Sequence, residues 1–138
     1  MGLLSSILRP HLEATAHCDL PCGVYDPAQA RIEAESVKAI QEKYQSNEDP
    51  EFRTRAVLIK EQRADLVKHH LWVLWTDYFK PPHFEKYPEL HELCKKATKK
   101  TGGGADGAKS SMDPATGQEL LDLIAQIDKI FWETKQAA

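Results

Sequence analysis

The pattern of apolar and polar positions is helical along most of the chain. Apolar residues recur at alternating steps of three and four over residues 27–45, 50–78, 88–100 and 114–135. This is the spacing of one face of an α-helix. No stretch shows the strict alternation that is typical of a half-buried strand. The pattern therefore predicts four amphipathic helices and no sheet.

Three Asp-Pro dipeptides predict where three of these helices begin. Asp26-Pro27, Asp49-Pro50 and Asp113-Pro114 each lie immediately ahead of a helical pattern. Asp is a good N-cap because its carboxylate accepts hydrogen bonds from amides that have no partner inside the helix. Pro suits the first helical position.

The segments between the helices predict how the helices are arranged. Pro81-Pro82 ends the second helix and turns the chain. Residues 101–112 contain four glycines and predict a flexible surface linker. Short connections between amphipathic helices predict an all-α protein, an antiparallel four-helix bundle, with residues 17–25 as an N-terminal hook ahead of it.

Each helix has a stripe that we expect to face the core. The four stripes are Ala30, Glu33, Val37, Ile40 and Tyr44; Phe52, Ala56, Ile59, Arg63, Leu66, His70 and Val73; Leu90, Leu93, Cys94 and Ala97; and Leu120, Ile124, Ile127 and Phe131. Glu33 and Arg63 are charged residues at apolar positions. Burying one such charge without a partner costs several kcal/mol. We therefore expect these two residues to form a polar contact between the first two helices.

Composition narrows the class of protein. A chain of 138 residues suits one domain with a modest core. It has 18 Lys and Arg against 21 Asp and Glu, a net charge of −3, so no basic excess indicates a nucleic-acid partner. No apolar run approaches the roughly 20 residues that span a membrane. Three cysteines are too few for a disulfide scaffold, which favours a reducing compartment.

The segment of residues 17–25, which we call the hook, concentrates the candidate chemistry. It contains His17, Cys18 and Cys22 within six residues, and Pro21 and Gly23 predict a compact loop. Two cysteines at this spacing could chelate a soft transition metal, but they could also form a surface disulfide or be idle thiols. A zinc site would need two further ligands, and no second Cys/His pair lies at the usual spacing.

Three stretches resemble the nickel superoxide dismutase family. They are residues 17–27 (HCDLPCGVYDP), 77–88 (DYFKPPHFEKYP) and 127–134 (IDKIFWET). The resemblance covers most of the chain after residue 16. It implies an oxidoreductase that converts superoxide to dioxygen and hydrogen peroxide by Ni(II)/Ni(III) cycling, with one nickel ion per subunit. It also implies a cytoplasmic homohexamer and a processing peptidase that removes a leader, residues 1–16, to leave residues 17–138 as the hook-and-bundle domain.

The resemblance assigns roles to individual residues. It places His17, Cys18 and Cys22 on the nickel ligands, Glu33 and Arg63 behind the axial imidazole, Tyr25 and Asp19 beside the open face of the metal, and Tyr78 and Lys80 along the approach. In this arrangement the His17 α-amine, the Cys18 amide nitrogen and the two thiolates form a plane, and the His17 imidazole is axial. Such a plane needs a free amine on His17, which explains why a leader would have to be removed.

Two other functions fit the same residues. A non-enzymatic nickel or copper carrier could use the same hook without turnover. A structural helical interaction module could have its arm closed by a disulfide. Outside the hook, Cys94 lies on an apolar stripe and predicts a buried, inert thiol, and His83 and His91 predict surface or interface positions.

Overall fold

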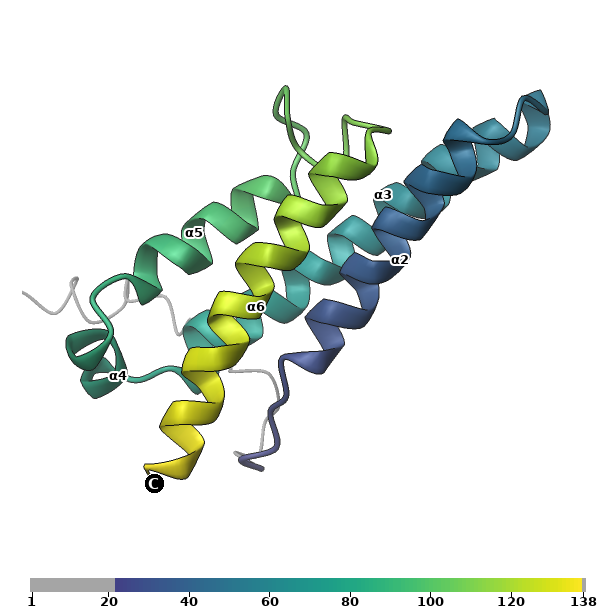
Figure 1. Cartoon of the computed structure of the whole chain (residues 1–138). Helices are drawn as coiled ribbons and strands as arrows, with labels where there is room; N and C mark the ends of the chain where they lie inside the picture. Colours follow the sequence, from purple (N-terminus) through teal and green to yellow (C-terminus); the bar gives the residue numbers. More distant parts are fainter. Residues whose placement is uncertain (1–21, 138) are drawn as a thin grey trace, which may run out of the picture.

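The computed structural model describes residues 22–137 and is helical over most of that range. In chain order its elements are α2 (Ala28–Gln45), α3 (Pro50–Trp72), the π-helix η1 (Val73–Tyr78), α4 (Pro81–Lys86), α5 (Leu90–Lys100) and α6 (Pro114–Gln136). No strand occurs among the described residues. The prediction of an all-α bundle is confirmed (Figure 1).

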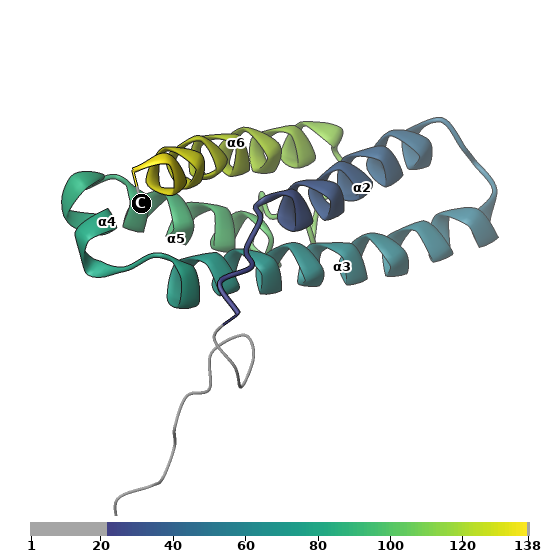
Figure 2. The same cartoon turned by 90° about the horizontal axis from the view of Figure 1, so that it is seen from below.

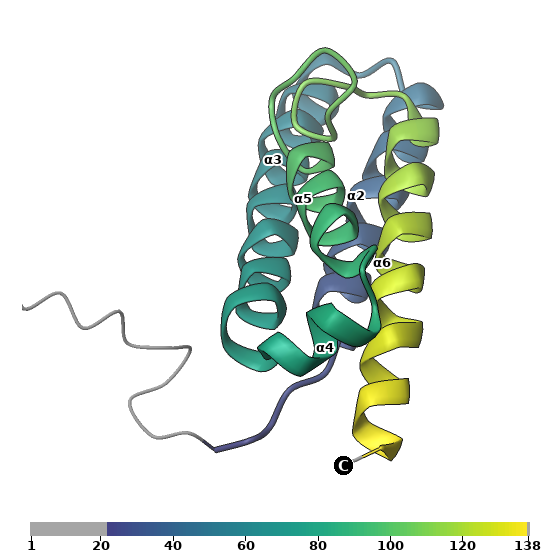
Figure 3. The ribbon, with the colours of Figure 1, turned by 90° about the vertical axis from the view of Figure 1, so that its left-hand side faces the viewer.

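Four long helices form the bundle. Helix α2 packs against α3 and α6, and α5 packs against the same two helices. Figures 2 and 3 show α3 and α6 on opposite sides, with α2 and α5 between them. The short helix α4 lies across the end at which α6 finishes. The first described residues leave α2 at that same end (Figure 3).

The Asp-Pro dipeptides mark helix starts as predicted. The Asp49 carboxylate accepts hydrogen bonds from the amides of Glu51 and Phe52, both at 3.3 Å, and Asp113 accepts one from Ala115 at 2.9 Å. Asp26 accepts a hydrogen bond from the amide of Ala28 at 2.8 Å, and α2 begins at Ala28, one residue later than predicted. These caps satisfy amides that the first helical turn leaves without partners.

Among residues 22–137, the predicted helix count was one short, because α4 was missed. Pro81-Pro82 was interpreted as a turn, yet the two prolines occupy the first positions of α4. Proline is tolerated there, since the amide that it lacks would have no helical partner. The end of the predicted second helix also differs, because residues Val73–Tyr78 form a π-helix rather than α-helix.

The predicted core stripe of the second helix was wrong by one position. The buried residues of α3 are Ala56, Lys60, Ala64, Val67 and Leu71. Ile59 and Leu66, which we expected to face inward, are 39% and 37% exposed. Adjacent stripes on a helix are both apolar here, so periodicity could not choose between them. Packing selected the stripe with alanines, because small residues let neighbouring helices approach closely.

The other stripes agree better with the prediction. All four predicted residues of α6 are buried, as are Leu90, Cys94 and Ala97 of α5. In α2 the buried positions are Ala30, Ala34, Val37 and Gln41, so Ala34 and Gln41 replace Glu33, Ile40 and Tyr44 of the predicted stripe. The three replaced residues are only partly buried.

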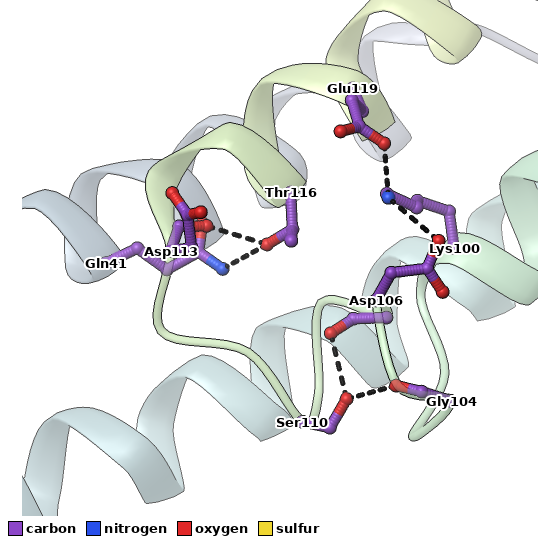
Figure 4. Close-up of polar contacts among 9 residues, drawn as sticks. Gln41, Lys100, Gly104, Asp106, Ser110, Asp113, Thr116 and Glu119 are labelled. Atoms are coloured by element: carbon purple, nitrogen blue, oxygen red, sulfur yellow. Dashed lines mark hydrogen bonds and ion pairs between the residues drawn. The ribbon is translucent and has the colours of Figure 1, made fainter.

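The glycine-rich segment 101–112 connects α5 to α6 without regular secondary structure, as predicted, but part of it packs into the bundle instead of lying entirely at the surface. Thr101, Gly107 and Ala108 in this segment are buried. A side chain on Gly107 would collide with the carbonyl of Gly102, so the glycine lets two segments of the backbone approach closely. Lys100 forms ion pairs with Glu119 and, at 3.6 Å, with Asp106, which ties the segment to α6 (Figure 4).

Two buried polar side chains, Lys60 of α3 and Gln41 of α2, donate hydrogen bonds to this segment. We call these two side chains and residues 101–112 together the polar cap. Lys60 is 1% exposed, and its Nζ donates to the carbonyls of Lys109 at 2.6 Å and Ser111 at 2.9 Å. Gln41 donates through Nε2 to the carbonyl of Ser111 at 3.1 Å and to Thr116 Oγ1 at 2.8 Å; Figure 4 shows the contact with Thr116. In the polar cap, donors from α2 and α3 therefore pair with the carbonyls of Lys109 and Ser111 and with the Thr116 hydroxyl.

Candidate metal centre

The structure describes the hook from Cys22 onward. Cys22 is exposed, and it precedes Gly23, whose φ of 69° lies in the left-handed region that glycine adopts readily. Residues 22–26 have no regular secondary structure and lead to the start of α2. The predicted ligand Cys22 therefore lies at the surface, beside a backbone bend.

The remaining hook residues are outside the described part of the chain. His17 and Cys18, the other two predicted ligands, and Asp19 lie among residues 1–21, which the structure does not describe. Among residues 22–137, no three His, Cys, Asp or Glu side chains come together in a group that could hold a metal ion. The complete ligand set stays a prediction.

Two predicted site residues, Tyr25 and Tyr78, are brought together by the fold although they lie far apart in sequence. Their ring centroids are 5.4 Å apart, with the ring planes at 54°. The Tyr78 hydroxyl shares a hydrogen bond of 2.7 Å with Thr134 Oγ1 on α6, and its ring lies 4.4 Å from that of Phe131. Tyr78 therefore joins the hook to the last turns of α6.

Lys80 is the N-cap residue of α4. Its side chain is exposed, and Nζ donates to the carbonyl of Asp77 at 2.8 Å. Its amide donates to Nδ1 of His83 at 3.1 Å, and the His83 ring stacks on Tyr78 with centroids 5.8 Å apart and an interplanar angle of 21°. His83, which we expected only at a surface or interface, therefore contacts a predicted site residue.

Glu33 and Arg63 pair as the sequence predicted. Arg63 Nη1 lies 3.1 Å from one Glu33 carboxylate oxygen and 3.3 Å from the other, which links α2 to α3. The Arg63 side chain is 40% exposed and the Glu33 side chain 18% exposed. The pair is thus only partly buried, so solvent screens its interaction more than the predicted core position implied.

Lys135 is a contact of the hook that sequence reasoning missed. Its Nζ donates to the carbonyl of Gly23 over 3.4 Å and lies 5.2 Å from the ring centroid of Tyr78. The nearest signal in the sequence was the matching stretch 127–134, which ends one residue earlier. That stretch also contains Thr134, the hydroxyl partner of Tyr78, to which no role was assigned.

Cys94 has the environment that the sequence predicted. It is 1% exposed within α5, and burial raises the pKa of its thiol to about 12. A thiol that holds its proton at neutral pH is a poor nucleophile and a poor metal ligand. Of the two cysteines that the structure describes, Cys22 has the more suitable position for a metal.

The fold and the site define a class: a small helical-bundle protein in which Cys22, the one described residue of the predicted ligand set, is exposed on the segment before α2. The family model described as nickel-containing superoxide dismutase matches residues 12–135. The chain belongs to this family.

Individual relatives agree over nearly the whole chain. It is 67% identical over 135 residues to the Superoxide dismutase [Ni] of Streptomyces coelicolor, and 67% identical over 135 residues to that of Streptomyces seoulensis. Each alignment covers 98% of this chain and 100% of the relative. A native crystal structure of nickel superoxide dismutase has a TM-score of 0.82 and 72% identity, with 87% of this chain and 99% of that chain covered. A structure with nickel ligation corresponding to the oxidized state gives the same values.

Proposed function

We propose that this protein is a nickel-dependent superoxide dismutase, an oxidoreductase that converts superoxide to dioxygen and hydrogen peroxide. The observation that carries the proposal is the family match over residues 12–135, which includes the hook. When bound, nickel supplies one-electron chemistry by alternating between its divalent and trivalent states. Each subunit would hold one nickel ion.

The residues present fit a nickel ion. The hook offers thiols, an imidazole and, after cleavage before His17, an α-amine, and soft thiolate donors suit a nickel centre that must be oxidised. In the described part, Cys22 is an exposed residue. We assign His17, Cys18 and Cys22 as the ligands. The buried Cys94 is not part of this ligand set.

The other site residues would control what reaches the centre. Tyr25, the last residue of the hook, and Tyr78 form a tilted aromatic pair, which would limit access to small molecules such as superoxide. Lys80 offers an exposed ammonium for the anionic substrate. Asp19 would lie beside the metal within the hook. Glu33 and Arg63 would orient the His17 imidazole, since partners of a ligating histidine fix its ring.

Processing of the chain is the second element of the proposal. Residues 1–16 would be a leader that a peptidase removes, because only a free His17 amine can act as a donor. Localisation would be cytoplasmic, in agreement with thiolate ligands that must stay reduced. None of the helices in residues 22–137 is long and apolar enough to cross a membrane.

Assembly is the third element. We expect a homohexamer of bundles, as the family resemblance implies. Large apolar side chains on the described surface support self-association: Ile32, Leu58, Ile59, Leu66, Trp72 and Trp132 are between 37% and 58% exposed. Light scattering coupled to size exclusion would measure the mass, and a monomer under all conditions would contradict this element.

The experiment that tests the function compares two forms of the chain, one starting at Met1 and one at His17, each reconstituted with nickel. We expect superoxide dismutation only from the form that starts at His17. Cys18→Ser and Cys22→Ser should each lose nickel, whereas Cys94→Ser should keep it. Nickel binding without turnover would favour a carrier instead. Full activity in the form starting at Met1 would contradict the ligand set.

A further inference from the structure

Lys135 connects the hook to the bundle from the last turn of α6. Its Nζ donates to the carbonyl of Gly23, 112 positions earlier in the chain, over 3.4 Å. The same ammonium lies 5.2 Å from the ring centroid of Tyr78 and 5.6 Å from that of Phe131, within the range of cation–π attraction. One cation therefore contacts the hook, η1 and its own helix.

These contacts close a ring of interactions around the base of the hook. Gly23 is held by Lys135, Lys135 lies over Tyr78, and Tyr78 contacts Tyr25, two residues after Gly23. The Tyr78 hydroxyl is fixed by Thr134, the neighbour of Lys135. The segment from Gly23 to Tyr25 is thus attached to the bundle at both of its ends.

The attachment at Gly23 matters because packing does not fix this residue. No heavy atom lies within 4 Å of the position that a Gly23 side chain would take, and its φ of 69° is one of several conformations that glycine adopts easily. A charge-assisted hydrogen bond to the Gly23 carbonyl restrains the peptide plane that follows it. Only the φ and ψ angles of Gly23 and the ψ angle of Cys22 lie between this restrained peptide plane and the Cys22 side chain, so the restraint narrows the region that the Cys22 thiol can reach.

We propose that Lys135 is a positioning residue of the nickel centre, which anchors the Gly23 carbonyl against Tyr78 and so fixes Cys22 relative to the bundle. The inference rests on the proposed function, since it concerns a thiol that serves as a ligand. Lys135 acts through Gly23 and Tyr78 rather than on the substrate. Loss of its ammonium should loosen the hook and leave the bundle intact.

The test uses the chain that starts at His17 and compares three variants with the wild type. Lys135→Met removes the ammonium and keeps the apolar stem, and Lys135→Arg keeps a cation. Lys129→Met is the matched control, because it removes the same charge from an exposed position of the same helix. Circular dichroism and thermal unfolding would establish that each variant folds.

Two readouts other than turnover decide the proposal. In nickel-free protein, hydrogen exchange of the amides in residues 22–26 should be faster in Lys135→Met than in wild type. In loaded protein, transfer of nickel to a chelator should be about 10-fold faster, the lower end of the effect of removing a group that orients a ligand. Lys135→Arg should restore most of both properties, and Lys129→Met should match wild type.

Other outcomes separate failure of this inference from failure of the proposed function. Wild-type exchange and nickel retention in Lys135→Met would overturn the positioning role. If only turnover fell, and this fall disappeared at high ionic strength, Lys135 would attract substrate and the positioning role would again be overturned. Wild-type protein that binds nickel without turnover would contradict the proposed function, while the exchange measurement would still decide whether Lys135 anchors the hook.

Discussion

At the scale of residues, Cys22 and Cys94 differ in exposure and therefore in chemistry. Cys22 is exposed, whereas burial raises the pKa of Cys94 to about 12 from an ordinary value of 9.0. The buried thiol therefore keeps its proton in the folded state over a pH range in which the unfolded chain loses it. Folding stability linked to this group is present below about pH 9 and decreases as the pH rises toward 12.

We expect Cys94→Ala to remove this alkaline sensitivity. Between pH 9 and 10, wild type should lose up to about 1.4 kcal/mol of unfolding free energy through this thiol, the value of one pKa unit. The variant should start from a lower stability because a cavity forms, and should decline less. Urea unfolding of both proteins at pH 8, 9 and 10 would measure the difference. Parallel declines would contradict the assignment.

The Glu33–Arg63 pair gives a second prediction at this scale. Because the Arg63 side chain is 40% exposed, breaking the pair by a single substitution should cost only about 1 kcal/mol. The double variant Glu33→Gln with Arg63→Met leaves no unpaired charge. It should fold and keep nickel, and it should lose about 10–100-fold in turnover if the pair orients the His17 imidazole. Electron paramagnetic resonance of the oxidised protein would report the axial nitrogen. Wild-type turnover would leave the pair a structural role.

At the scale of elements, the contact between α2 and α6 depends on Gly117. A side chain at this position would lie 2.5 Å from Gln41 Oε1 and 2.8 Å from Lys38 Cβ. Alanine is the better helix former by about 1 kcal/mol, yet here the helices would have to move apart. Close approach of the two helices therefore outweighs helix propensity.

We expect Gly117→Ala to destabilise the protein by roughly 1–3 kcal/mol, the usual cost of overpacking. Gly103→Ala is the control, because nothing lies within 4 Å of its side-chain position and its φ is not positive. The control should be neutral or slightly stabilising. Chemical denaturation would measure both. Equal stability of the two variants would show that α2 and α6 separate at little cost.

The π-helix η1 is the other element with a consequence for the site. The amide of Phe79 donates to the carbonyl of Leu74 over 3.0 Å, the wider step of a π-helix. The chain then leaves the helix, and Tyr78 is held between Thr134 and the Tyr25 ring. Such irregular turns are frequent at functional sites.

At the scale of the whole molecule, the start of the described chain and the glycine-rich segment of the polar cap lie at different ends of the bundle. The first described residues, α4 and the end of α6 lie at one end, and the segment between α5 and α6 lies at the other (Figure 3). Burial lowers the pKa of Lys60, although Glu61 opposes this shift. The cost of burying the Lys60 charge therefore diminishes as the pH rises toward the ordinary value of 10.5, at which the unfolded chain still binds the proton.

We expect Lys60→Met to destabilise the protein by about 1–3 kcal/mol, because the carbonyl of Lys109 would lose its Lys60 donor. Hydrogen exchange should increase in the polar cap and stay unchanged in residues 22–26 at the opposite end. Lys99→Met, at an exposed position of α5, should change neither property. Equal exchange in wild type and Lys60→Met would show that Lys60 does not hold the segment.

The sequence alone determined the features that depend on near neighbours. The Asp-Pro dipeptides set helix starts because a cap bonds to amides two or three residues away. The predicted α6 stripe was correct because its four apolar residues recur at helical spacing, and all four are buried. The resemblance over the hook identified the family that the comparisons show. The ligand roles of His17, Cys18 and Cys22 stay predictions.

Tertiary structure decided the features that depend on distant segments. Packing between helices decided which stripe of α3 is buried, and Lys60 on that stripe donates to a carbonyl in the segment between α5 and α6. The approach of Lys135 to Gly23 joins residues 112 positions apart. A hydrogen bond of this kind has no periodicity or local motif, since it exists only when α6 ends beside the hook.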